Sequence, residues 1–154
     1  MDVVDLKVLA FGNNMMKKSF RGVYAYDTLP ALVRRYPSSY IVNTDRAGER
    51  GAHWIAIYFE SRQLCDVFDS YGMAPFGEIY AFAARNAAVV HYSTRWLQSP
   101  TSGLCGAYCI YFLYFRSRGH ATDVITGPPL EEYRWKDNDA HVRDFLRLWL
   151  EDAR

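Results

Sequence analysis

The segment that most constrains the fold is the apolar run from Cys105 to Arg116. Apolar and aromatic residues occupy almost every position of this run, so it offers no polar face to solvent. It is longer than a typical strand, and this favours a helix that is buried on nearly all sides. A polar loop at residues 98–103, rich in Ser, Thr, Gly and Pro, precedes the run and marks its start. The rest of the chain must therefore surround a central helix.

The composition supplies the material for such a core. The chain has 154 residues, of which 50% are hydrophobic and 16% are aromatic. This is enough for one compact domain with a substantial core and too little for two. No internal repeat and no linker rich in Pro, Gly or Ser divides the sequence. We therefore expect a single domain over residues 1–154.

The remaining pattern predicts strands and helices in mixed order. Strands are predicted where β-branched and aromatic residues cluster, at residues 40–43, 53–59, 64–68 and 88–92. Helices are predicted from periodicity, from composition or from a preceding Pro, at residues 3–10, 75–86 and around 142–149. Residues 17–40 read as irregular, residues 43–51 as a loop, and Gly127-Pro128-Pro129 as a break. The fold class is α+β: a small mixed sheet, a buried central helix and flanking helices.

Charge and cysteine content exclude several classes of protein. The formal net charge is +1, which does not suit a strongly basic nucleic-acid-binding domain. Three cysteines, Cys65, Cys105 and Cys109, argue against a disulfide framework and for a reducing, intracellular compartment. No apolar run reaches the length of a membrane span, and the first residues do not form a secretory signal. We expect no membrane association and no metal site.

Cys105 is placed where a nucleophile would be activated. It follows the polar loop and begins the predicted central helix, where backbone amides and the helix dipole stabilise a thiolate. The same amides point at any oxyanion that forms beside the sulfur. A cysteine is more often a small core residue, and we interpret Cys65 and Cys109 in that way. The context of Cys105 favours chemistry.

Three polar residues complete a candidate site. His53 opens one predicted strand and could accept the thiol proton, whereas Asp69 ends the next strand and could orient the imidazole. Gln98 lies seven residues before Cys105, so the loop could fold its amide over the sulfur as an oxyanion donor. Each residue alone has a simpler structural explanation. The order His, Asp, Gln, Cys makes the set specific.

These residues lie within motifs that resemble the adenovirus protease family of cysteine proteases, which is related to the ubiquitin-like-protein proteases. The similar segments are Ile41-Val42-Asn43-Thr44 followed by His53-Trp54, Gln98 with Cys105-Gly106, and Val124-Ile125-Thr126-Gly127-Pro128. The resemblance runs from about Leu6 to the C-terminal helix. It implies a papain-related fold and endopeptidase activity on viral precursor proteins, at sites with small residues such as Gly. It also implies a virion or host-nucleus location.

The resemblance implies roles for particular residues. His53, Asp69, Cys105 and Gln98 would form the catalytic set. The backbone amides at Cys105, Trp54 and Gly106 would complete the oxyanion hole and position the substrate. The human adenovirus enzymes of this family are activated by a disulfide-linked peptide and use DNA as a cofactor. No cysteine lies between Cys65 and Cys105, so any activating peptide is expected to bind without a disulfide.

Two other functions remain open from the sequence. A deubiquitinase or SUMO-type isopeptidase would use the same four residues on a folded modifier. A catalytically dead protease fold could serve as an interaction module. No cofactor is predicted, and the net charge argues against strong DNA binding. A local basic patch could still form from Lys17, Lys18, Arg21, Arg34 and Arg35.

Overall fold

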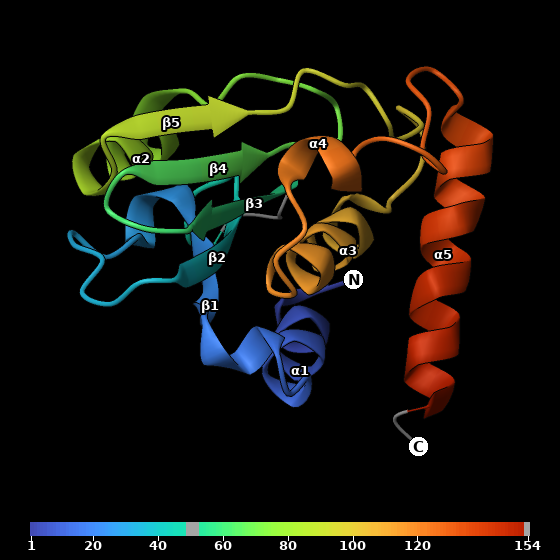
Figure 1. Ribbon diagram of the computed structural model, residues 1–154, viewed down its shortest axis with the longest axis horizontal. Coiled ribbons are helices and arrows are strands. Elements are labelled where there is room, and N and C mark those ends of the chain that lie inside the picture. The colour runs from blue at the N-terminus through green and yellow to red at the C-terminus, as the bar shows by residue number, and fades with distance from the viewer. Residues whose placement is uncertain (49–52, 153–154) are drawn as a thin grey trace.

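A computed structural model describes residues 1–48 and 53–152 of the chain, which fold around one mixed sheet (Figure 1). The strands follow the order of the sequence across the sheet: β1 (Phe20–Ala25), β2 (Ser38–Asn43), β3 (Trp54–Phe59), β4 (Leu64–Phe68) and β5 (Val89–Tyr92). β2, β3 and β4 pair antiparallel, whereas β1 pairs parallel with β2 and β5 pairs parallel with β4. The small mixed sheet expected from the sequence is confirmed.

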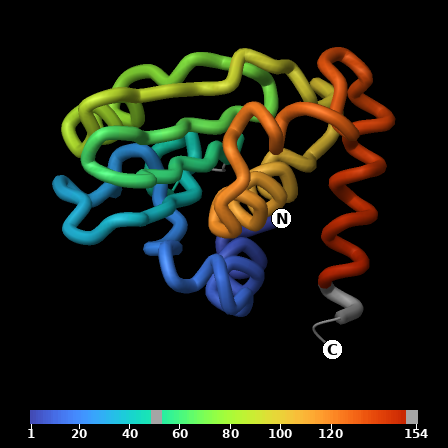
Figure 2. The backbone as a smooth tube through the Cα atoms, viewed as in Figure 1, coloured from blue at the N-terminus to red at the C-terminus, as the bar shows by residue number. Residues whose placement is uncertain are grey.

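Helices cover both faces of this sheet. They are α1 (Val3–Gly12), α2 (Gly77–Asn86), α3 (Cys105–Arg116), α4 (Thr122–Ile125) and α5 (Trp135–Asp152), with 3₁₀ turns at Met16–Lys18 and Tyr26–Thr28. α3 lies between the sheet and α5, and α1 packs beside α3 (Figure 1). Figure 2 traces the long segment that leaves β5 and crosses the molecule to the start of α3. No helix in the described ranges has the length and hydropathy to span a bilayer.

The alternation of side chains along β3 explains why both faces need cover. Ile55, Ile57 and Phe59 point into a cluster with α2, whereas Ala56 and Tyr58 point into the cluster around α3. Successive side chains of a strand face opposite sides of a sheet, so a strand with apolar residues at every position must be buried on both faces. Each fully buried large apolar side chain contributes about 1.5–3 kcal/mol to folding.

The central helix fulfils the expectation from the apolar run. α3 begins at Cys105 and ends at Arg116, and most of its side chains are buried. It contacts β3 on one side and α5 on the other. The only strong charge on the helix is Arg116 at its last turn, which is itself buried. The N-terminus of α3 is therefore held in place by the packing of the whole helix.

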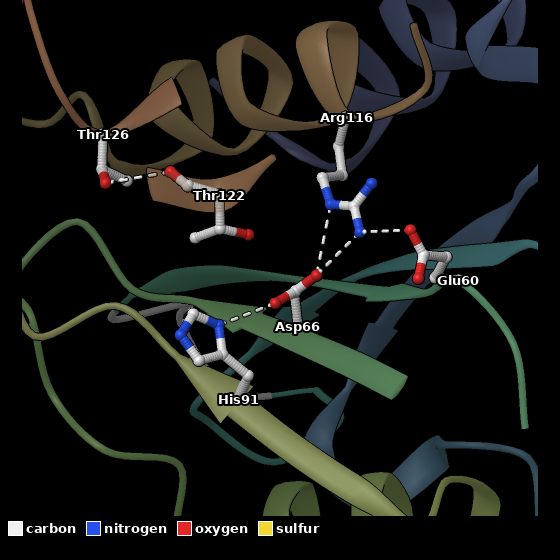
Figure 3. Close-up of polar contacts among 6 residues, drawn as sticks. All are labelled: Glu60, Asp66, His91, Arg116, Thr122 and Thr126. Carbon is white, nitrogen blue, oxygen red and sulfur yellow. Dashed lines mark hydrogen bonds and ion pairs between the residues drawn. The ribbon is translucent and has the colours of Figure 1, made fainter. Parts of the chain in front are cut away.

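An ion network anchors the far end of α3 to the sheet (Figure 3). The guanidinium of Arg116 donates to Asp66 Oδ2 at 3.0 and 3.2 Å and to Glu60 Oε1 at 3.2 Å. His91 Nδ1 lies 2.8 Å from Asp66 Oδ1, and the Arg116 guanidinium stacks over the Tyr58 ring. The pKa of Arg116 is raised: burial alone would lower it, but the hydrogen bonds and charges of Asp66 and Glu60 outweigh burial.

Parts of the fold differ from the sequence predictions or add to them. The segment predicted to be irregular at 17–40 contains β1, which pairs in parallel with the next strand, β2. The sequence did not predict α4, which precedes the predicted break at Gly127-Pro128-Pro129. The register of β4 and β5 places His91 opposite Asp66. The loop predicted at 43–51 is described only as far as residue 48, and residues 49–51 lie outside the described residues.

Candidate active site

Strand pairing brings His53 and Asp69 to one end of the sheet. His53 directly precedes β3, and Asp69 directly follows β4. The antiparallel register pairs Ala56 with Phe68, so the start of β3 and the end of β4 lie side by side. His53 Nε2 lies 2.7 Å from Asp69 Oδ1, and the two side chains are only 14% and 11% exposed. A short, shielded contact of this kind holds the imidazole in one orientation.

The carboxylate of Asp69 is fixed by the turn that follows it. Asp69 Oδ1 also accepts a hydrogen bond from the backbone N–H of Tyr71 at 2.8 Å. Gly72 closes the turn with φ +72°, and a Cβ at this position would lie 2.6 Å from the carbonyl oxygen of Thr94. Only glycine suits both the backbone conformation and the close approach. The turn therefore packs directly against the segment that leads to Gln98.

Tyr71 also contacts the imidazole itself. Its ring stacks on His53 with the centroids 4.6 Å apart and an interplanar angle of 14°. Tyr71 was not singled out from the sequence. The sequence feature that could have identified it is an Asp followed two residues later by an aromatic residue in a predicted turn. In such a turn the Asp side chain accepts a hydrogen bond from the backbone N–H two residues on. The aromatic identity gives the ring a face to offer to the histidine.

Cys105 meets His53 from the helix side. Its sulfur is hydrogen-bonded to His53 and to the backbone amides of Trp54 and Gly106. Burial alone would raise the pKa of the Cys105 thiol, but these hydrogen bonds and the histidine charge lower it overall. Burial alone would lower the pKa of His53, but Asp69 and Cys105 raise it from 6.5 to about 9. The site is built to hold a thiolate beside an imidazolium.

The other two cysteines have the opposite environment. Cys65 lies in β4 and Cys109 lies one turn along α3, and both are fully buried in apolar clusters. Burial raises the pKa of both thiols. Neither can readily form a thiolate at neutral pH. Their interpretation as core residues agrees with this burial.

The backbone directly after Cys105 is tightly packed. A Cβ at Gly106 would lie 3.2 Å from Leu6 Cδ2 and 3.4 Å from Trp54 Cδ1. The absence of a side chain at Gly106 lets the first turn of α3 approach the start of β3. The amide groups of Trp54 and Gly106 can then face the same sulfur. The close approach of Gly106 to Trp54 thus places both backbone amides beside Cys105.

Gln98 is buried but is bonded to its own loop. Its side chain is 0% exposed, and its Oε1 accepts a hydrogen bond from the Ser70 hydroxyl. Its Nε2 donates to the carbonyl oxygen of Ser102 at 2.8 Å and makes a longer contact of 3.3 Å with Ser102 Oγ. The structure thus brings His53, Asp69 and Cys105 into direct contact and fixes the Gln98 amide between the Asp69 turn and the loop before α3.

An aromatic cluster borders this site. Trp96 lies within 6.3 Å of both Tyr71 and Tyr133 and within 4.8 Å of Trp135, measured between ring centroids. Tyr133 is exposed and has φ +66°, an uncommon conformation for an aromatic residue. Among the residues that the structure describes, no group of three or more His, Cys, Asp or Glu side chains could hold a metal ion.

Comparisons with known proteins agree with this geometry. The adenovirus endoprotease family matches residues 20–132. A protease of Bovine adenovirus 2 is 28% identical over 149 residues, which cover 82% of this chain and 69% of that protein. A protease of Human adenovirus D serotype 17 is 32% identical over 90 residues, covering 48% of this chain and 43% of that protein. A protease of serotype 9 is 30% identical over 113 residues, covering 63% and 50%.

A solved structure shares the fold. A crystal structure of an ASFV protease superposes with a TM-score of 0.56 at 16% sequence identity, covering 79% of this chain and 60% of that protein. At this identity the likeness concerns the fold alone. The match to the two human adenovirus proteases spans half of their length or less.

Proposed function

The chain belongs to the adenovirus endoprotease family, and from that premise we propose that it is a cysteine endopeptidase that cleaves viral precursor proteins. One observation carries the proposal. His53 lies between Asp69, at 2.7 Å, and the thiol of Cys105 at the N-terminus of the central helix. This is the arrangement of nucleophile, base and orienting group that covalent catalysis requires.

The two nitrogens of His53 have separate partners. Asp69 occupies Nε2, which leaves Nδ1 for the sulfur of Cys105. The thiolate attacks the carbonyl carbon of the scissile peptide bond and forms a C–S bond. The imidazolium gives its proton to the leaving amine as the C–N bond breaks, and a thioester remains. His53 then removes a proton from water, which attacks the thioester and releases the acid and the thiol.

The negative charge on the carbonyl oxygen needs fixed donors during both steps. The backbone N–H groups of Trp54 and Gly106 lie at the sulfur, beside which such an oxygen would develop, and we assign the backbone N–H of Cys105 as a third donor. We assign the fourth donor to the Nε2 group of Gln98. Ser70 and Ser102 support this assignment, because they hold the amide in one orientation without occupying both of its N–H groups at short distance.

Family membership supports a polypeptide substrate with small residues such as Gly at the cleavage site, and action in the virion or host nucleus. An activating peptide, where one is used, would bind without a disulfide. Cys65 and Cys109 are fully buried, so Cys105, the proposed nucleophile, is the one cysteine accessible for a disulfide with a peptide. The proposed steps use only groups of the chain and require no cofactor.

A labelling experiment tests this proposal. A thiol-directed probe that carries a peptide ending in Gly-Gly should label wild-type protein stoichiometrically at Cys105, as read by mass spectrometry of the digested chain. Cys105→Ala should abolish labelling, and His53→Ala should slow it strongly. His91→Ala is the matched control, because His91 also pairs with an aspartate, at 2.8 Å, but lies outside the proposed catalytic set.

The outcomes separate the functions that the sequence left open. Equal labelling of wild type and His53→Ala would contradict the activated nucleophile and favour a dead protease fold. Efficient turnover of a Gly-Gly-linked ubiquitin-like modifier, without cleavage of unfolded precursor peptides, would assign an isopeptidase instead.

A further inference from the structure

A second pocket lies away from the catalytic site. It has a volume of about 640 Å³ and lies between the end of α2, the segment before β2 and the turn that joins β3 to β4. Three arginines line it, one from each of these parts: Arg85, Arg34 and Arg62. None of the described residues that line it is acidic. We refer to the space between these three residues as the arginine pocket.

The walls of the arginine pocket are held by hydrogen bonds. Asn86 Oδ1 accepts from the backbone N–H of Val33 at 2.8 Å, and the Tyr36 hydroxyl donates to the Asn86 carbonyl at 2.7 Å. Arg85 Nε donates to the carbonyl oxygen of Ala31 at 2.8 Å. These contacts fasten the segment before β2 to the end of α2. The pocket is therefore largely formed in advance of any ligand.

The three positive charges have no counter-charge among the side chains that the structure describes. Within residues 1–48 and 53–149, no carboxylate lies within ion-pair distance of Arg34, Arg62 or Arg85. The guanidinium of Arg62 lies 5.7 Å from the centroid of the Tyr36 ring. Other arginines of the chain, such as Arg116 and Arg147, do pair with acids. Although the net charge of the chain is only +1, positive charge is therefore concentrated around this pocket.

Two further arginines extend this basic surface along the edge of the sheet. Arg21 on β1 donates to Ser38 Oγ at 2.8 Å and to the Pro37 carbonyl at 3.1 Å, which ties it to the segment before β2. Burial and the nearby charge of Arg35 lower the pKa of Arg21. Of the basic patch that the sequence suggested, Arg34 lines the pocket and Arg21 lies near Arg35, whereas Arg62 and Arg85 join Arg34 from later in the chain.

We propose that the arginine pocket binds a small ligand that carries two or more adjacent phosphate groups. Like charges gathered in a concave site repel one another unless an anion occupies the space between them. The planar guanidinium presents paired N–H donors that match two phosphate oxygens, which makes arginine the preferred residue for phosphate recognition. A pocket of this volume accommodates a short chain of phosphates.

The site is independent of the proposed catalysis. Arg62 precedes β4 and Asp69 follows it, so the two residues lie at opposite ends of the same strand. The five residues of β4 lie between them and span about 15 Å. Binding can therefore be measured on protein with Cys105 blocked or replaced, and its outcome does not depend on protease activity.

The test is titration calorimetry of the full chain with inorganic tripolyphosphate at low ionic strength. We expect one ligand per chain and a loss of affinity of about tenfold in each of Arg34→Gln and Arg62→Gln. Arg147→Gln is the matched control, since it removes the same charge from an exposed arginine that pairs with Asp144 on α5. Equal thermal melting of all four proteins would show that the variants remain folded.

Two further titrations identify the source of the phosphates. Sulfate at matched ionic strength should bind far more weakly than tripolyphosphate. A double-stranded oligonucleotide should not compete with tripolyphosphate for the site. The proposal would be overturned if tripolyphosphate did not bind, or if Arg147→Gln lost as much affinity as the pocket variants. It would also be overturned if the oligonucleotide displaced tripolyphosphate with an affinity that rises with oligonucleotide length. The last result would indicate a nucleic-acid surface.

Discussion

The Tyr71 ring lies flat on the His53 imidazole, with the centroids 4.6 Å apart, while the Tyr71 backbone N–H donates to the carboxylate that holds the same imidazole. One residue thus acts on both members of the His53–Asp69 pair. The π face of a tyrosine favours a cation above it, so the stacking stabilises the imidazolium over the neutral ring.

Replacing Tyr71 should separate these two effects. Tyr71→Leu removes the ring but keeps the backbone N–H, and we expect kcat/KM to fall by about tenfold because a cation–π contact contributes about 0.5–2 kcal/mol. The alkaline limb of the pH profile should move to lower pH as the imidazolium loses stabilisation. Tyr71→Phe retains the ring and should resemble wild type. An unshifted profile in Tyr71→Leu would limit Tyr71 to a structural role.

The raised pKa of His53 and the lowered pKa of Cys105 predict how activity depends on pH. The thiolate forms below the ordinary thiol pKa of 9, and the imidazolium persists until its own pKa of about 9. Peptidase activity should therefore rise with pH on the acid side of this window, as the thiol ionises, and fall again near pH 9. Initial rates at fixed low substrate concentration across the pH range measure both limbs.

Alkylation by iodoacetamide provides the control for this assignment. In wild type the rate should rise at a pH below 9, because the histidine stabilises the thiolate and lowers the thiol pKa. In His53→Ala the rise should move toward pH 9, the ordinary value for a thiol. Identical profiles in the two proteins would show that the histidine does not lower the thiol pKa.

Gln98 should affect turnover more than substrate binding. Gln98→Ala removes the proposed oxyanion donor, and loss of one such donor costs about 10²–10³-fold in kcat. The same change leaves Ser70 without its acceptor, so the protein should also lose stability. Ser70→Ala isolates the second effect, since the Gln98 amide keeps its bond to Ser102. A kcat in Ser70→Ala as low as in Gln98→Ala would argue that Gln98 acts only through the fold.

The ion network at the far end of α3 should govern stability. Asp66→Asn leaves the buried guanidinium of Arg116 without its main counter-charge, and breaking a buried pair in this way costs about 3–5 kcal/mol. Urea denaturation followed by circular dichroism measures the loss. His91→Gln should cost much less, because the His91 side chain is 45% exposed and its removal leaves the Arg116 contact in place. Comparable losses in the two variants would contradict this ranking.

The sequence predicted the parts of the fold that depend on local pattern. The bounds of α3 follow from an apolar run that ends at Arg116, and β3 and β4 follow from their aromatic and β-branched residues. β1 was missed because its pairing with β2 is parallel and non-local, and Gly22 interrupts its register. No local pattern in Phe20–Ala25 indicates that partner.

The candidate site was predictable in its members but not in its contacts. The order of His53, Asp69 and Cys105 suggested the set, and the contact between the first two depends on the register of β3 and β4. The hydrogen bonds of Gln98 depend on the positions of Ser70 and Ser102, which are set by the conformation of loops that the sequence does not predict. The arginine pocket could be predicted only in part, because Arg62 and Arg85 join Arg34 through the packing of α2 on the sheet.

The position of Cys105 at the start of the buried helix makes one sulfur atom a reporter for the whole molecule. Its low pKa requires the first turn of α3, the start of β3 and the turn after β4 to be in place together. Any variant or condition that loosens the core should slow alkylation of this thiol before secondary structure is lost. The buried thiols of Cys65 and Cys109 should become reactive only on unfolding. In one chain, fast alkylation of Cys105 would therefore report the assembled site, and alkylation of the other two cysteines would report unfolding.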